Sequence, residues 1–239
     1  MTDQTIAPLK NVGLFAGLMN QLVSRPAHLP GLGIFHGHSG LGKTFAATYA
    51  AHKNRALYVE VGASWGQKKF LERLLRECGV AKPRGTIADM VEQVIDRLDR
   101  PLIIDEMDAV VARKYWEIVR EIHDKTRTPI VMIGEEWLPK KLEATADRFN
   151  NRILAWVAAV PADVADAKHL ARLYAPDVVF EDDVLAEIVK ATRGRARLIC
   201  NNIYQVSQAR LAVGKKTAAL ADVDAARFHT GFAPGERVA

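Results

Sequence analysis

The sequence predicts an α/β fold: a five-stranded parallel sheet flanked by helices, followed by a small all-α domain. Three observations lead to it. The glycine-rich segment Gly37–Thr44 lies between a short apolar run and a helix-compatible run. Strand-like runs, most of them continuously apolar, alternate with helical patterns up to residue 160, which is typical of a parallel sheet covered on both faces. From Pro161 onward the apolar residues recur at helical spacing.

The glycine-rich segment matches G-x-x-x-x-G-K-[ST], the phosphate-binding loop of P-loop NTPases. Its positions are Gly37, His38, Ser39, Gly40, Leu41, Gly42, Lys43 and Thr44. The glycines allow a tight turn whose backbone N–H groups, together with the start of the following helix, face an anion. We expect Lys43 to reach the β- and γ-phosphates and the Thr44 hydroxyl to ligate Mg²⁺, so the predicted cofactors are ATP and Mg²⁺. A glycine-rich turn that happens to precede a helix is the alternative, which the lysine-threonine ending disfavours.

The expected elements of the first domain follow in chain order. A helix is predicted over residues 11–25, beginning at an Asn11 N-cap. Short apolar runs predict strands at 32–35, 56–61, 101–106, 129–134 and 153–160. Helical spacing predicts helices at 44–53, 67–78, 87–98, 115–125 and 135–145, the last despite Pro139. Gly79 is expected to end one of these helices and Thr86 to cap the next.

The second half of the pattern is helical. Helices are predicted at 164–173, 183–191, 197–213 and 220–227, and the apolar residues 178–180 are the single strand candidate. The patterns divide the chain into a nucleotide-binding α/β domain at 1–160, a helical lid domain at 161–228 and a flexible tail at 229–239.

Composition and charge narrow the class of protein. The chain has 239 residues, 49% apolar and 26% charged, as in ordinary soluble globular proteins. We see no membrane-length apolar run and no signal peptide, and the two cysteines show no metal-ligand spacing, so we expect a cytoplasmic protein without a membrane partner. The net charge of +5 favours an acidic partner such as nucleic acid. Between Glu187 and Asp222 there is no acidic residue, but there are seven basic ones: Lys190, Arg193, Arg195, Arg197, Arg210, Lys215 and Lys216. Such a run can also be only a solvated helix face, which is the alternative interpretation.

A second nucleotide motif follows the third strand. Ile103–Glu106 consists of apolar residues that end in two carboxylates. Asp105, at the strand tip, would hold Mg²⁺ through water, and Glu106 would polarise the attacking water. An ordinary strand end with acidic residues is the alternative. Asp108 is expected to be exposed and to have no role in the site.

Arginines are candidates for contact with the γ-phosphate, where such a group can contribute ~10³-fold or more to the rate. Arg148 and Arg152 precede the fifth strand, at an edge where a second subunit would dock, and Arg152 is slightly preferred. A pair of surface arginines is the alternative. Arg197, with Arg195 in reserve, begins a helix of the small domain and is expected to fold back onto the nucleotide. Glu135, just beyond the fourth strand, lies where a polar residue would contact the attacking water.

Taken in this order, the two motifs, the arginines before the fifth strand and the stretch Gly194–Arg197 resemble the AAA+ ATPases. The compact core and the phrase Ile133–Glu136 look like the transposition ATPases, namely the B target-DNA activators of Mu-like phages and their transposon relatives, over roughly residues 10–210. The resemblance implies an ATPase that assembles on double-stranded DNA as a homo-oligomeric filament or ring, selects target DNA and stimulates a transposase. It also implies a phage or mobile-element protein in a bacterial host cell.

DNA contact is expected from the ATPase core, because the 36 residues before Gly37 are too few for the additional N-terminal DNA-binding domain of the phage Mu type. Candidate residues lie in two loops expected near the carboxyl ends of the strands: Trp65, Lys68, Lys69, Arg113 and Lys114. Lysines directed at phosphates bind DNA without reading its sequence. In the alternative reading, Trp65 belongs to the core and the lysines are only solvated.

Two other functions remain open at this stage. A helicase loader of AAA+ type would act on single-stranded DNA, although residues 1–30 are short for a helicase-binding segment. A nucleotide-gated adaptor would use ATP to join subunits with little hydrolysis, which the presence of Glu106 disfavours. A small-molecule kinase is disfavoured because no acceptor-site signature accompanies the phosphate loop.

Overall fold

The computed structural model describes residues 7–143, 147–224 and 227–231. The chain forms two compact units. The first, which we call the sheet unit, comprises residues 12–38 and 43–159; the second, the helical unit, comprises residues 1–11, 39–42 and 160–239. The division of labour between a nucleotide-binding domain and a lid domain stays a prediction.

The sheet unit is built on five parallel strands in the order β2-β3-β4-β1-β5, which confirms the predicted fold class. The strands are β1 (Leu32–His36), β2 (Leu57–Glu60), β3 (Leu102–Asp105), β4 (Ile130–Gly134) and β5 (Ile153–Ala158). Every residue of β3 and β4 is buried, as their continuous apolar runs predict. Since β1 and β3 both pair with β4, the two nucleotide motifs leave the same carboxyl edge of the sheet, separated by one strand.

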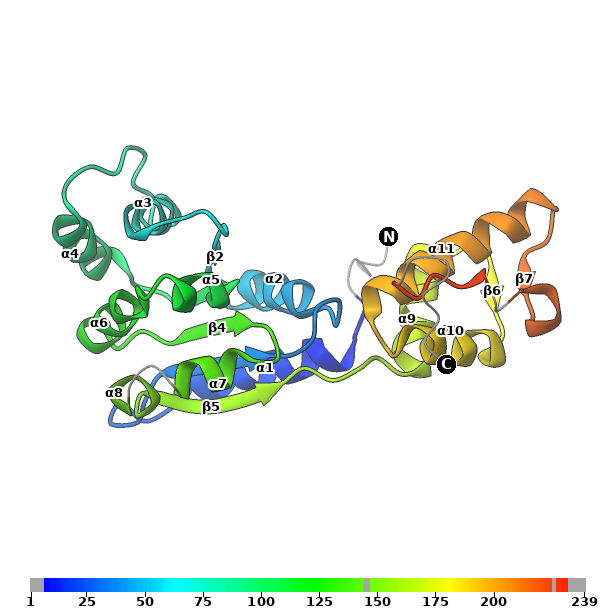
Figure 1. The fold of residues 1–239 in the computed structure, drawn as a ribbon, viewed down its shortest axis with the longest axis horizontal. Coiled ribbons are helices and arrows are strands. Elements are labelled where there is room, and N and C mark those ends of the chain that lie inside the picture. Colours follow the sequence, from blue (N-terminus) through cyan, green and yellow to red (C-terminus); the bar gives the residue numbers. More distant parts are fainter. Residues whose placement is uncertain (1–6, 144–146, 225–226, 232–239) are drawn as a thin grey trace. The chain divides into compact units, whose positions relative to one another are not determined.

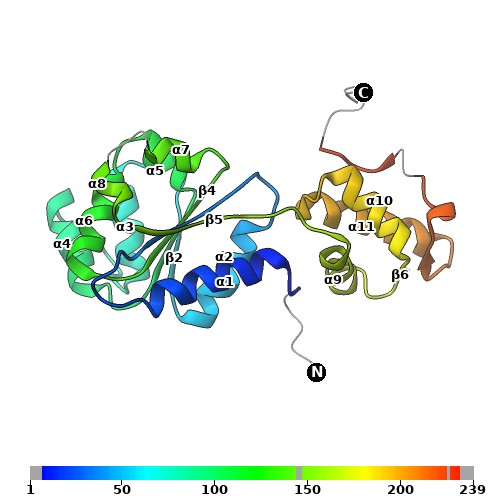
Figure 2. The ribbon, with the colours of Figure 1, turned by 90° about the horizontal axis from the view of Figure 1, so that it is seen from below.

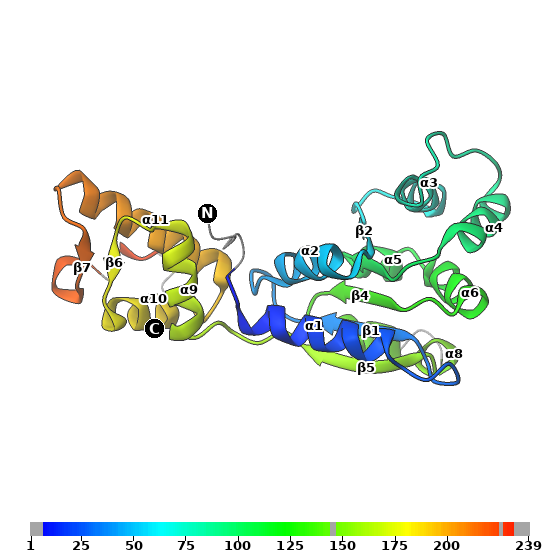
Figure 3. The same cartoon turned by 180° about the vertical axis from the view of Figure 1, so that it is seen from behind.

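Helices cover both faces of this sheet. They are α1 (Lys10–Val23), α2 (Lys43–Asn54), α3 (Gln67–Glu77), α4 (Ile87–Arg97), α5 (Met107–Ala112), α6 (Trp116–Thr126), α7 (Leu138–Glu143) and α8 (Asp147–Asn150). Figure 2 shows α1 and α2 on one face and α5 and α7 on the other. Figure 3 shows α1 beside β1 and β5. The approach of α1 is close: a Cβ on Gly33 would lie 2.6 Å from Leu22 Cδ1, so a larger residue cannot be accommodated there without a shift.

The helical unit contains three packed helices (Figure 1), namely α9 (Val164–Tyr174), α10 (Asp182–Thr192) and α11 (Ala196–Ala212). The strand candidate at 178–180 appears as β6 (Val179–Phe180), which pairs in parallel with β7 (Thr217–Ala218). The sequence reading missed β7, which has only two residues. Arg210 belongs to the cationic run but is buried, and its Nε donates to the Thr217 carbonyl at 2.8 Å, so this arginine holds the strand rather than facing solvent.

Several element boundaries differ from the predicted ones. The helix α5 was not predicted, because six residues are too few to display a helical period. The predicted helix at 135–145 is shorter, since only 138–143 is helical, and residues 144–146 lie outside the described part. Instead of an α-helix at 220–227, the described residues form a 3-10 helix, η1, at Leu220–Asp222. Further along the chain, the Asn202 side chain donates to the His229 carbonyl at 2.9 Å and accepts from the His229 N–H at 2.7 Å, and so holds this residue against α11.

Asn11 is not the N-cap of the first helix, which already begins at Lys10. Its buried side chain instead donates to the carbonyls of Leu41 (2.9 Å) and Val160 (2.8 Å) and accepts from the Val160 N–H (2.9 Å). Leu41 belongs to the phosphate loop, so Asn11 fixes one carbonyl of that loop. The prediction of an N-cap was wrong because a tertiary network uses the side chain.

We expect Asn11→Ala to lower the free energy of unfolding by about 2–3 kcal/mol, because it leaves buried backbone groups of Leu41 and Val160 without partners. Urea denaturation followed by circular dichroism measures this loss. The matched control is Asn20→Ala, an exposed position on the same helix, where a change within about 0.5 kcal/mol is expected. Equal losses in the two variants would contradict the role given to Asn11.

Candidate active site

The phosphate loop leaves the carboxyl end of β1 and enters α2. Gly40 and Gly42 have φ values of +86° and +85°, in the left-handed region that glycine adopts without strain. The Lys43 ammonium folds over the loop and donates to the carbonyls of Gly37 (2.5 Å) and His38 (2.9 Å). Burial lowers the pKa of Lys43, and the surrounding carboxylates only partly oppose this effect. A phosphate would therefore meet a poorly solvated cation that has to exchange carbonyl partners for phosphate oxygens.

Within the helical unit, the start of α11 contacts the loop segment 39–42. The Arg197 N–H donates to the Gly40 carbonyl at 3.1 Å. A Cβ on Gly40 would lie 3.7 Å from Arg195 Cβ and 3.8 Å from Arg197 Cβ, so both candidate arginines are adjacent to this glycine. The Arg197 side chain is exposed and Arg195 is half-buried. Contact of either guanidinium with a nucleotide stays a prediction.

Asp105 is the centre of a hydrogen-bond network at the tip of β3. Its side chain is almost fully buried, with 3% exposure. Oδ2 accepts from the Thr44 hydroxyl at 2.8 Å and from the Tyr58 hydroxyl at 2.9 Å, and Oδ1 accepts from the Glu106 N–H at 2.8 Å. The structure thus brings Thr44 and Asp105 together, as the sequence predicts. Tyr58 was missed, because no motif links a tyrosine on β2 to this carboxylate.

Glu106 has an unusual backbone. Its φ of 58° and ψ of 42° are left-handed, a conformation that costs a non-glycine residue roughly 1–2 kcal/mol. Non-glycine residues that are held in such a strained conformation are concentrated at functional sites. Partial desolvation by neighbouring groups, followed by the negative charges of Asp105, Asp108 and Glu135, raises the pKa of the Glu106 carboxyl, and Lys43 partly opposes this. The residue as a whole keeps enough exposed surface for water to approach it.

Asp108 is not exposed, contrary to prediction. Its side chain is only 16% accessible and accepts from the Lys141 ammonium at 2.5 Å and from the Glu135 N–H at 2.7 Å. The undetected helix α5 is the reason, because it turns Asp108 toward the end of β4. Glu135 itself is exposed. The carboxylate of the next residue, Glu136, contacts the His38 ring of the phosphate loop, so this contact joins the loops that follow β1 and β4.

Arg152 lies at the opposite, amino-terminal edge of the sheet, where its carbonyl accepts from the Leu32 N–H at 3.0 Å. It precedes β5, an edge strand. Its Nε forms an ion pair with Asp124, which also pairs with Arg120 at 3.0 Å. Burial alone would raise the pKa of Asp124, but its bond to Arg152 and the two arginine charges hold that pKa below its ordinary value. Arg148 is in α8, but its side chain lies outside the described part of the structure.

The predicted DNA-contacting residues lie in two neighbouring segments. Trp65 is in the loop after β2, partly buried against the hydrophobic core, and its carbonyl accepts from the Tyr115 hydroxyl at 3.3 Å. Tyr115 directly follows Arg113 and Lys114, so this bond connects the loop after β2 with the loop after α5. Lys68 and Lys69 were expected in a loop but belong to the first turn of α3. All four cations are exposed, namely Lys68, Lys69, Arg113 and Lys114, while Trp65 contributes to packing.

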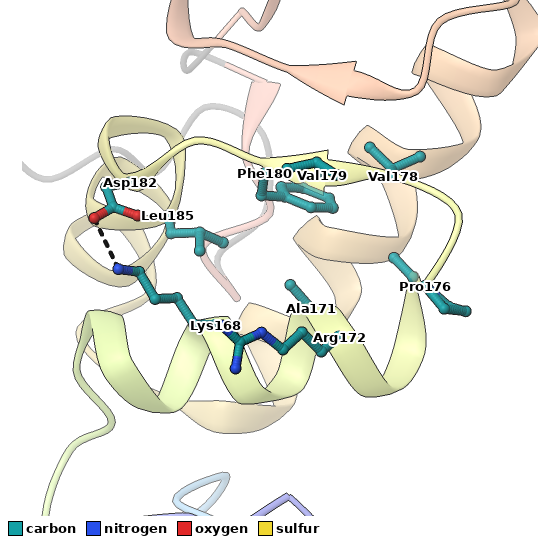
Figure 4. A pocket seen from close by; sticks show the side chains of 10 residues that line it. Lys168, Ala171, Arg172, Pro176, Val178, Val179, Phe180, Asp182 and Leu185 are labelled. Carbon is teal, nitrogen blue, oxygen red and sulfur yellow. Dashed lines mark hydrogen bonds and ion pairs between the residues drawn. The ribbon is translucent and has the colours of Figure 1, made fainter. Parts of the chain in front are cut away.

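The helical unit contains a pocket of about 360 Å³ that is separate from the nucleotide motifs in its lining (Figure 4). Leu185 and Phe180 form apolar walls, and Lys168 pairs with Asp182 across one end at 2.8 Å. Within the described residues, no group of three or more His, Cys, Asp or Glu could hold a metal by itself. None of the described helices combines the length and apolar character that a bilayer span requires.

Comparison with known proteins gives a family match for part of the chain and structural matches for nearly all of it. Residues 27–142 match the family model of an AAA domain. No curated protein matches the sequence. The structure is similar to that of the Aeropyrum pernix ORC2 protein in ADPNP and ADP complexes, with a TM-score of 0.66 at 15% identity over 91% of this chain and 68% of that one.

Two further solved structures show the same likeness. CDC6P from Pyrobaculum aerophilum gives a TM-score of 0.66 at 16% identity over 93% of this chain and 68% of that one. The Aeropyrum pernix ORC1 protein in complex with DNA gives 0.62 at 15% identity over 93% and 66%. At such identities the likeness establishes the fold, and function has to be argued from the site.

Proposed function

We propose that this chain, whose residues 27–142 carry an AAA domain on a P-loop ATPase fold, binds and hydrolyses ATP and thereby controls its own assembly on double-stranded DNA. The observation that carries the proposal is the meeting of Thr44, Asp105 and Glu106 beyond the carboxyl ends of β1 and β3. A phosphate loop, a buried carboxylate and a strained glutamate in this arrangement are the parts that phosphoryl transfer to water requires.

The residues present fit Mg²⁺. The Thr44 hydroxyl and the Asp105 carboxylate are oxygen ligands 2.8 Å apart, and hard divalent cations prefer such oxygens. When bound there with a nucleotide, Mg²⁺ would neutralise charge that develops on the phosphates. Lys43 would leave the carbonyls of Gly37 and His38 and bind phosphate oxygens instead. Glu106 would orient the attacking water and accept its proton.

The finer role that we propose is selection of target DNA for transposition, with a transposase as partner. The exposed cations at the start of α3 and after α5 suit a phosphate backbone, and these lysines and arginine offer no pattern for reading bases. A protein that must accept many target sequences needs binding of this kind. The cytoplasm of a bacterial host of a phage or mobile element is the proposed location.

A second candidate is binding to defined DNA sequences. The Aeropyrum pernix ORC1 protein, whose structure this chain resembles over 93% of its length, is solved in complex with DNA. A helicase loader and an adaptor with little hydrolysis remain further alternatives. Target selection requires tolerance of many sequences, so sequence preference distinguishes the first two candidates.

The experiment compares binding to random-sequence duplex DNA with ATP, ADP or no nucleotide, by gel shift and electron microscopy. Filaments or rings that form only with ATP and fail to form with Lys43→Ala support the proposal. Binding restricted to defined sequences would favour the second candidate, and preference for single strands would favour a loader. Tight ATP binding without DNA association in any nucleotide state would leave the adaptor.

Arg152 is proposed to act on the nucleotide of a neighbouring subunit. Arg152→Ala is then expected to lower kcat for ATP hydrolysis by ~10³-fold, since a positive charge at the transferred phosphoryl group is lost. A 1:1 mixture of Arg152→Ala with Glu106→Gln, each nearly inactive alone, should regain activity, because some interfaces then combine an intact Arg152 with an intact Glu106. Phosphate release measures both results.

The ion pair of Arg152 with Asp124 requires a control. Asp124→Asn weakens the same pair but keeps the arginine, so it should retain most of the wild-type kcat. If Asp124→Asn is as inactive as Arg152→Ala, the arginine acts through the structure of its own subunit. A mixture that shows only the summed activity of its two components would exclude action in trans.

A further inference from the structure

Tyr58 reaches the nucleotide site from outside both sequence motifs. It lies on the edge strand β2 and pairs in register with Ile103 of β3. Alternate residues of a strand share one face, so Tyr58, Ile103 and Asp105 project from the same side of the sheet. Asp105 is two residues, or about 6.6 Å, further along, a span that the tyrosine ring bridges. The Tyr58 hydroxyl ends 2.9 Å from Asp105 Oδ2.

This hydroxyl is one of three donors that satisfy a buried carboxylate. The other two are the Thr44 hydroxyl, on the same oxygen, and the Glu106 N–H, on the other oxygen. Thr44 is also the residue that a metal would engage, so its hydrogen bond has to adjust when the site fills. Neither the Tyr58 hydroxyl nor the Glu106 N–H is expected to engage the metal. They define the orientation of the carboxylate independently of the nucleotide.

We propose that Tyr58 is a positioning residue for Asp105, which it holds in the orientation needed to receive Mg²⁺ together with a nucleotide. This inference rests on the proposed ATPase function. Partners that orient a metal-binding carboxylate typically contribute 10- to 100-fold to metal affinity or activity. Without Tyr58, the carboxylate can turn away from Thr44, and the divalent cation binds a less organised pair of oxygens.

Tyr58→Phe tests the proposal, because it removes the hydroxyl and keeps the buried ring. Binding of a fluorescent ATP analogue is titrated at a series of Mg²⁺ concentrations and in EDTA. We expect the Mg²⁺ concentration for half-maximal binding to rise by about 10- to 100-fold, whereas affinity in EDTA stays unchanged. At saturating Mg²⁺, kcat should recover to near the wild-type value. Tyr49→Phe is the matched control, since the Tyr49 hydroxyl makes no hydrogen bond among the described residues and its loss should change neither quantity.

Three results would overturn the proposal. One is an unchanged Mg²⁺ dependence in Tyr58→Phe. The second is an equal loss of nucleotide affinity with and without Mg²⁺, which would indicate a general effect on the fold. In that case the melting temperature of the nucleotide-free variant should also fall by more than a few degrees. The third is a wild-type protein whose nucleotide binding never responds to Mg²⁺, which would remove the proposed function as well and is recognised by the behaviour of the wild type alone.

Discussion

Glu106→Gln is expected to lower kcat for ATP hydrolysis by about 10²–10⁴-fold, the usual contribution of a positioned general base. The amide keeps the size of the side chain and the backbone bond to Asp105, but it cannot accept a proton from water. ATP binding should persist, since Lys43 and Thr44 are untouched. Phosphate release gives kcat, and titration with a fluorescent ATP analogue gives the affinity.

The control for this substitution is Glu92→Gln, an exposed carboxylate on α4, which should leave kcat unchanged. A Glu106→Gln variant that retains most of the wild-type kcat would exclude Glu106 as the base. The raised pKa of Glu106 adds an independent check. As pH falls through that raised pKa, the base becomes protonated, so the acid limb of the kcat/KM profile should lie above the ordinary glutamate pKa of about 4.3.

The same shift has a consequence for stability. A carboxyl whose pKa is raised in the folded protein stabilises the fold only while it is protonated, and this contribution is lost as pH rises through the folded pKa. At neutral pH the ionised Glu106 therefore opposes folding, in addition to its left-handed backbone. Glu106→Gln should be slightly more stable than the wild type at neutral pH, which would mean that this site sacrifices stability for its chemistry.

The sheet and the two nucleotide motifs could be predicted because their signals are local. A short continuous apolar run rich in β-branched residues, such as Ile130–Gly134, favours a strand buried on both faces. The glycines of the phosphate loop and the acid pair after β3 have fixed spacings, and parallel strands bring their carboxyl ends to one edge. The contact of Thr44 with Asp105 follows from these rules.

What escaped prediction depends on contacts between segments far apart in the chain. The Asn11 side chain donates hydrogen bonds to carbonyls 30 and 149 positions away in the chain, and because these bonds occupy it, the side chain does not cap the helix. Asp108 was expected in solvent because its partners come from elsewhere in the chain: Lys141 from α7, and the Glu135 N–H from the residue after β4. Tyr58 looks like any strand tyrosine until the register of β2 and β3 is known. Such networks are built from ordinary residue types, so no sequence pattern marks them.

Lys43→Ala is expected to lower ATP affinity by about 10²-fold or more, because two charge-assisted hydrogen bonds to phosphate oxygens, each worth roughly 1.5–3 kcal/mol, are lost. Among the described residues the ammonium bonds two carbonyls of its own loop, and burial lowers its pKa more than the nearby carboxylates raise it. A phosphate would bring negatively charged oxygens into direct contact with it. The affinity is measured by fluorescent-analogue titration, and the stabilisation by ATP through the melting temperature.

The melting temperature separates lost binding from lost structure. At ATP concentrations of about 100 times Kd, binding should stabilise the wild type by about 2.7 kcal/mol, whereas Lys43→Ala should gain almost nothing. Lys53→Ala, an exposed lysine on the same helix α2, should respond to ATP like the wild type. A full ATP-dependent shift in Lys43→Ala would show that the nucleotide binds elsewhere. Glu106→Gln should keep this ATP-dependent shift and lose only hydrolysis, so the two variants together separate nucleotide binding from hydrolysis. If assembly on DNA survives in Glu106→Gln but not in Lys43→Ala, assembly requires bound ATP and not its hydrolysis.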